Sequence, residues 1–64
     1  MNTDNIVGFY LTHTVNGRST KTRFAKEDLR LFKQWIDICK QRGFSYEAEA
    51  IIKAKNGYVI CRLV

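Results

Sequence analysis

The sequence predicts an α+β fold in which one helix packs on a four-stranded antiparallel sheet, in the order β-β-α-β-β. Residues 6–15 and 44–55 alternate their side chains with a period of two, which is typical of strands. Asn-Gly pairs at 16–17 and 56–57 are strong signals for hairpin turns. Between the two hairpins, residues 26–42 carry apolar side chains at helical spacing.

The first hairpin joins strand 6–15 to strand 18–24 through Asn16-Gly17. A two-residue turn fixes the register, so Phe9 is expected opposite Phe24 and Tyr10 opposite Arg23. One face of the first strand is expected to point toward the helix and the other, outer face away from it. Ile6 falls on the outer face. The face toward the helix is expected to carry Val7, Phe9, Leu11, His13 and Val15.

The helix is expected from about Lys26 to Arg42, with Ala25 as N-cap and Gly43 in the left-handed position that ends it. Its predicted core stripe comprises Ala25, Leu29, Phe32, Ile36 and Cys39. A second apolar row lies at i, i+4 and i+7 and is rotated away from that stripe: Leu31, Trp35 and Ile38. Either a loop or terminus seals this row, or it is a contact surface for another chain.

The segment 45–55 supports two interpretations. Strict alternation and the following Asn56-Gly57 favour a strand, with Ala54 opposite Val59 and Ile52 opposite Cys61. Its Ala, Glu and Lys content and the capping Ser45 also suit a helix, which would give the order β-β-α-α-β. We adopt the strand and keep the helix as the alternative.

The length and composition set the class of protein. With 64 residues the chain is expected to form one domain, residues 1–64, too small for a deep pocket that would take a small-molecule substrate. No apolar run approaches the ~20 residues of a membrane span, and the first residues lack a secretory signal. Two cysteines in such a chain suggest reduced thiols and a cytoplasmic location.

No set of residues indicates catalysis. The single histidine, His13, is expected to face inward and to be hydrogen-bonded by its neighbour Thr20, and the carboxylates are scattered. Cys39 and Cys61 are expected as buried small side chains and lack the spacing of zinc ligands. The sequence therefore predicts a protein that is not an enzyme and holds no metal or cofactor.

The charge is more informative. Eleven Lys and Arg against six Asp and Glu give +5, which favours nucleic acid or an acidic protein surface as partner. The outer face of the predicted sheet gathers cations and aromatic rings, reduced only by Glu47 and Glu49. Such a face suits phosphates and stacked bases. The predicted nucleic-acid-binding residues are Tyr10, Lys21, Arg23, Lys53, Lys55, Tyr58 and Arg62.

A second hypothesis places function on the helix. There the domain is a protein-interaction or inhibitor module that binds a partner protein, or a second copy of itself, through Leu31, Trp35 and Ile38. In its size, single-module organisation and basic charge the chain resembles the small accessory proteins of phages and mobile elements. No residue motif carries this resemblance, and no functional residue is taken from it.

Overall fold

The computed structural model describes residues 5–63 and confirms the α+β fold. A short 3-10 helix, η2, precedes the one α-helix of this part of the chain, and residues 45–54 are strand, so the helical alternative for that segment is wrong. The elements are β1 (Ile6–Val15), β2 (Arg18–Ala25), η2 (Lys26–Asp28), α1 (Leu29–Arg42), β3 (Ser45–Ala54) and β4 (Gly57–Arg62).

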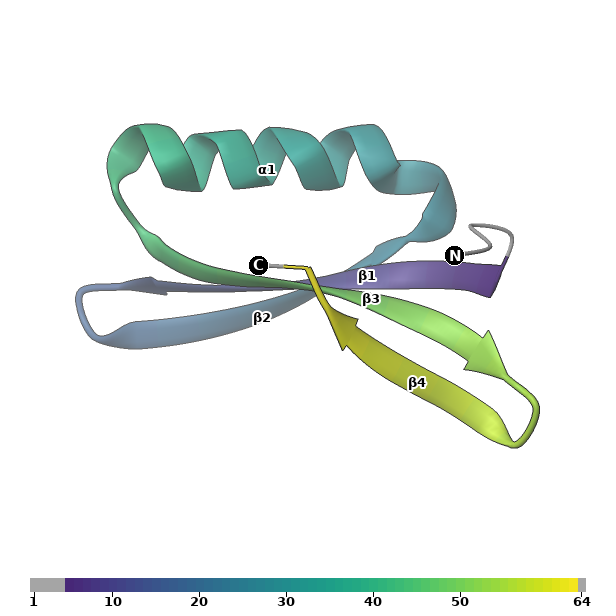
Figure 1. The fold of residues 1–64 in the computed structure, drawn as a ribbon. Coiled ribbons are helices and arrows are strands. Elements are labelled where there is room, and N and C mark those ends of the chain that lie inside the picture. The colour runs from purple at the N-terminus through teal and green to yellow at the C-terminus, as the bar shows by residue number, and fades with distance from the viewer. Residues whose placement is uncertain (1–4, 64) are drawn as a thin grey trace.

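The four strands form one antiparallel sheet in the order β2-β1-β3-β4, so β2 and β4 are its edges. Helix α1 lies across one face and packs against β1, β2 and β3 but makes no comparable contact with β4 (Figure 1). The far end of the β3–β4 hairpin projects away from the helix (Figure 1). The radius of gyration is accordingly 12.4 Å, against about 11 Å for a compact chain of this length.

The first hairpin has the predicted register. Phe9 pairs with Phe24 and Tyr10 with Arg23. Asn16 and Gly17 have φ of 54° and 79°, the two positive values that a type I′ turn requires. The predicted faces are wrong for the first residues of β1. A bulge between Ile6 and Gly8 shifts the alternation, so that Ile6, and not Val7, packs against the core.

The second hairpin has a different register from the predicted one. Ile52 pairs with Val59 and Ala50 with Cys61, and Ala54 pairs with Gly57. The tip of the turn is Lys55-Asn56, and Gly57, with φ of 133°, is the first residue of β4. Each partner is thus displaced by two residues from the expectation. Because side chains alternate with a period of two, the displacement leaves every residue on its predicted face.

Helix α1 ends as expected. Gly43 has φ of 70°, and its N–H bonds to the carbonyl of Lys40 while Phe44 donates to the carbonyl of Cys39 at 2.9 Å, the two bonds of a Schellman motif. At the other end the first turn is the 3-10 segment η2. A 3-10 turn has fewer residues than an α-helical turn, so the side chains before α1 point in other directions than an α-helix would give them. Only the part of the predicted core stripe from Phe32 onward therefore faces the sheet.

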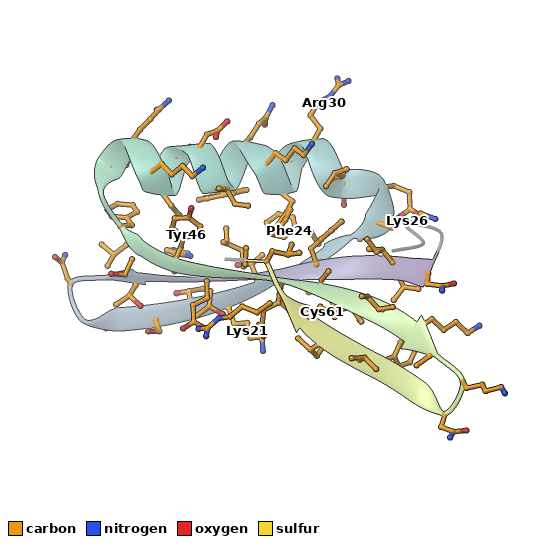
Figure 2. All side chains as sticks on the ribbon, in the orientation of Figure 1. Lys21, Phe24, Lys26, Arg30, Tyr46 and Cys61 are labelled. Carbon is orange, nitrogen blue, oxygen red and sulfur yellow. The ribbon has the colours of Figure 1, made fainter. Side chains whose placement is uncertain are left out.

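The core lies between the helix and the sheet. Phe32 stacks on Phe9 at 4.6 Å between ring centroids and meets Phe24 at 5.6 Å. Figure 2 shows Phe24 and Tyr46 in this layer. Ala25 and Leu29, predicted as core, are exposed instead. The buried cluster comprises Phe9, Leu11, Phe24, Phe32, Cys39, Ala48 and Ala50, with Ile36 partly buried against it.

Candidate functional site

The face of the sheet opposite α1, here called the outer face, carries the predicted nucleic-acid-binding residues of the strands. Lys21 projects from this face in Figure 2, away from the helix. Tyr10 lies beside Arg23 on β2 and beside Glu49 on β3, and Lys53 lies beside Tyr58 across the second hairpin. Lys55 is the exception, since it occupies the tip of the turn and not a strand.

A shallow hollow occupies this face. Its volume is about 310 Å³, at the lower limit for ligand pockets, and it is open to solvent. Three of its lining residues, Tyr10, Arg23 and Tyr58, were predicted from the sequence. Ile51 and Ile60, which face each other across β3 and β4, were not. The outer-face hollow is lined by Tyr10, Arg23, Ile51, Tyr58 and Ile60.

Gly8 explains the apolar floor of this hollow. A Cβ atom at Gly8 would lie 2.9 Å from the carbonyl oxygen of Phe24 and 3.4 Å from Cδ1 of Ile51. The missing side chain therefore leaves room for Ile51, which is only 5% exposed although it lies outside the helix–sheet core. The signal in the sequence was a glycine among the outer-face positions of β1, beside an isoleucine that breaks the charged row of β3.

The charges of the outer face divide into two groups. Nζ of Lys21 lies 4.0 Å from Oε1 of Glu49 and 4.4 Å from the ring centroid of Tyr10. Nη2 of Arg62 lies 2.8 Å from Oε1 of Glu47. The described part of the chain contains no ion pair to the remaining three cations, Arg23, Lys53 and Lys55. Of these three, Arg23 lines the hollow, whereas Lys53 and Lys55 lie farther along the second hairpin toward its tip.

The two tyrosines differ in how they present their rings. Tyr58 is 68% exposed at the edge strand β4. Tyr10 is partly buried in the middle of the sheet, and the ammonium of Lys21 covers its ring. Tyr58 is therefore the ring that is open to stacking, whereas Tyr10 forms part of the wall.

The second predicted surface lies on the helix. Leu31, Trp35 and Ile38 are 36–45% exposed, so nothing in the described chain seals this row. Trp35 stacks on His13 with 6.2 Å between ring centroids and 26° between the planes. The Nδ1 atom of His13 is buried and has no hydrogen-bond partner among the described residues, so the expected bond to Thr20 is not formed there.

The two cysteines are free thiols in different surroundings. Cys39 is buried in the core, and this burial raises the pKa of its thiol because the charged thiolate is poorly solvated there. Cys61, on β4, is only partly buried, which corrects its prediction as a core residue. Within residues 5–63 no group of three or more His, Cys, Asp or Glu side chains is arranged to hold a metal ion.

The one α-helix described here is too short and too polar to cross a membrane. Comparison of the chain with protein-family models, with curated proteins and with solved structures found no match.

Proposed function

We propose that this protein is a binding module for single-stranded nucleic acid and that the outer-face hollow is its site. The observation that carries the proposal is the position of Arg23, Lys53 and Lys55. Among the described residues none of the three has a carboxylate partner. Arg23 lines the hollow, Lys53 pairs with the exposed Tyr58 across the second hairpin, and Lys55 lies at the tip of that hairpin.

The chemistry of the hollow fits an unpaired base better than a duplex. An exposed aromatic ring next to isoleucine side chains offers a stacking surface for the face of a base, and that face is hidden inside a double helix. Arg23 in the hollow and Lys53 beside Tyr58 would hold the phosphates on either side of a base stacked there. Arg23 has a second use, because its planar guanidinium also stacks on bases.

The paired cations of the outer face support the same interpretation. Arg62 and Glu47 are both exposed, and an exposed ion pair contributes only about 0–1 kcal/mol. A phosphate near Arg62 or Lys21 therefore competes with a carboxylate at little cost. Binding is expected to recruit these two side chains and to weaken steeply as salt increases.

The test is fluorescence anisotropy with labelled single-stranded RNA, single-stranded DNA and duplex DNA, at low and near-physiological salt. Tyr58→Ala should weaken single-strand binding by about 1–3 kcal/mol, which is the usual contribution of one base–aromatic stack. Arg23→Glu should weaken binding to all strands. Arg30→Glu is the matched control, because Arg30 points away from the sheet on the outside of α1 (Figure 2) and its reversal changes the net charge equally.

Three results would contradict the proposal. One is the absence of binding at low salt. Another is an equal loss with Arg23→Glu and Arg30→Glu, which would indicate that net charge alone attracts the strand. The third is tighter binding to the duplex than to either single strand, which would remove the stacking role of Tyr58.

A second candidate function rests on the helix row. Leu31, Trp35 and Ile38 share one flank of α1, and tryptophan is frequent among the residues that dominate protein interfaces. A protein-interaction module that uses this row should lose its partner with Trp35→Ala and keep it with Tyr58→Ala. Pull-down with the two variants side by side separates this function from nucleic-acid binding.

A further inference from the structure

The two edges of the sheet differ in their side chains. Strand β2 is polar, with cations at Arg18, Lys21 and Arg23, and charged side chains of this kind protect an edge from pairing with other strands. Strand β4 has one charged residue, Arg62. Four apolar or aromatic side chains of β4 and of the residue after it are 46–68% exposed: Tyr58, Val59, Ile60 and Leu63.

The backbone of β4 presents its free groups in a definite phase. Leu63 donates its N–H to the carbonyl of Ala48 on β3, at 2.8 Å. In an antiparallel pair, successive residues point their N–H and C=O groups alternately toward the partner strand and away from it. The N–H of Leu63 points toward β3. The residues of β4 whose N–H and C=O groups point away from β3, to the open edge, are therefore Tyr58, Ile60 and Arg62.

We propose that β4 pairs antiparallel with β4 of a second copy of this chain, about a two-fold axis at Ile60. This register places Ile60 opposite Ile60 and Tyr58 opposite Arg62 of the second copy. It uses the backbone groups of the three outward residues, which no other described strand pairs with, so the edge is complementary to itself. It also pairs an aromatic ring with a guanidinium across the strands on both sides of the axis.

Charge selects a second β4 over the other edge. Pairing β4 with β2 of another copy would bring the cations of β2 beside Arg62 and polar side chains beside Ile60. It would also leave one free edge on each chain and continue into a filament, whereas the two-fold pairing closes. In the β4 pairing Arg62 is the one charged residue of each strand, and Glu47 of the same chain already neutralises it.

The dimer completes the outer face, and this part rests on the proposed function. In the two-fold register Arg62 of the second copy borders Tyr58, which lines the hollow. Two hollows then lie side by side on one continuous sheet, and each has an additional cation at its rim. A single strand that crosses the axis would contact both copies.

The contact area is modest. Three residues of backbone pairing give an interface smaller than the standard size of about 1,600 Å². We expect a reversible dimer that is populated from the micromolar range upward. Because each chain carries +5, the dimer should tighten as salt increases, whereas nucleic-acid binding should weaken.

Sedimentation equilibrium of the protein without nucleic acid tests the pairing. Ile60→Lys and Ile60→Glu should each be monomeric, because the register sets two like charges against each other at the axis. An equimolar mixture of I60K and I60E should recover the dimer, since residue 60 faces only itself. Thr22→Lys is the control: it adds the same charge to the other edge and should leave the dimer unchanged.

Each other outcome overturns the proposal. A wild-type chain that stays monomeric up to millimolar concentration excludes the dimer. A dimer that persists in I60K, and is lost with Trp35→Ala, assigns the contact to the helix row. Two charged variants that fail to recover the dimer on mixing exclude the two-fold register. Circular dichroism verifies that each variant is folded. If I60K is unfolded, Ile60→Thr replaces it: threonine keeps a branched side chain and should weaken the dimer.

The same variants separate the dimer from the proposed function. A positive mixing experiment with no oligonucleotide binding would keep the β4 dimer and reject the nucleic-acid site. Ile60 also lines the hollow, so the converse test uses the wild-type chain. Equal affinity for short strands below and above the concentration at which it dimerises would keep the site and limit the dimer to long strands.

Discussion

The two hairpins of this protein follow the same plan, yet they differ in their turns, in their contact with the helix and in their edge strands. The β1–β2 hairpin has a type I′ turn at Asn16-Gly17, is covered by α1 and ends in a polar, basic edge strand. The β3–β4 hairpin turns at Lys55-Asn56, projects beyond the helix and ends in an apolar edge strand. The β1–β2 hairpin supplies Phe9, Leu11 and Phe24 to the core, whereas β4 of the second hairpin leaves apolar side chains unburied.

This difference indicates a division of roles. Phe9 and Phe24 of the first hairpin close around Phe32 of the helix, so the stability of the domain depends on them. The second hairpin contributes Ala48 and Ala50 to that core from β3, while β4 lies outside it. An element that the fold needs little and that remains apolar is suited to binding another molecule.

The largest expected effect comes from removing the aromatic centre of the first hairpin's core. Phe32→Ala should destabilise the domain by about 3–5 kcal/mol, because it leaves a cavity between Phe9 and Phe24. Val59→Ala, on the half-exposed β4, should cost no more than about 1 kcal/mol. Urea unfolding followed by Trp35 fluorescence measures both, and Phe32→Leu serves if the alanine variant is unfolded. Equal losses would contradict the division of roles.

A smaller difference is expected between the free energies of unfolding that are lost when the glycine of each turn is replaced by alanine. Gly17 has φ of 79°, close to the left-handed region that alanine tolerates, so Gly17→Ala should cost roughly 1 kcal/mol. Gly57 has φ of 133°, outside that region, so Gly57→Ala should cost about 1–3 kcal/mol. No neighbouring atom lies within 4 Å of either added Cβ, so thermal unfolding reports backbone strain alone. A larger loss at Gly17 would indicate that the second turn re-forms in the predicted register.

The smallest perturbation compares the two thiols. Cys61 lies on β4, the strand that α1 leaves uncovered, and should react with a maleimide in the folded protein. Cys39 should react only when the core opens, because it is buried and its raised pKa keeps the thiolate scarce. Mass spectrometry of the singly labelled protein identifies the modified residue, and Cys61→Ala should abolish the fast phase. Fast labelling of Cys39 would mean that the helix detaches readily from the sheet.

The sequence predicted the first hairpin and the end of the helix from local signals. Asn16-Gly17 determines its own register because both residues accept positive φ, and Gly43 closes α1 for the same reason. The second Asn-Gly pair misled the prediction of register. The turn formed one residue earlier, at Lys55-Asn56, and left Gly57 to supply the positive φ at the start of β4.

The candidate site was predicted in part. Alternation alone placed Tyr10, Arg23 and Tyr58 on one face, since a two-residue error in register does not change the face. The apolar floor escaped prediction because it depends on Gly8 of β1 lying beside Ile51 of β3. That contact joins residues from the two hairpins, and no pattern within either hairpin specifies it.

By itself, the sequence determined the first hairpin, the helix and its end, the faces of the strands beyond the bulge in β1 and the excess of positive charge, because periodicity and turn chemistry are local properties. For residues 45–55 it left strand and helix both open. Only the tertiary structure decided that β3 lies beside β1, that β2 and β4 are the edges, and that α1 leaves β4 uncovered. Strand order depends on which surfaces pack best across long separations in the chain, and alternation is equally satisfied by every order. The apolar edge of β4 and the floor of the hollow follow from that packing.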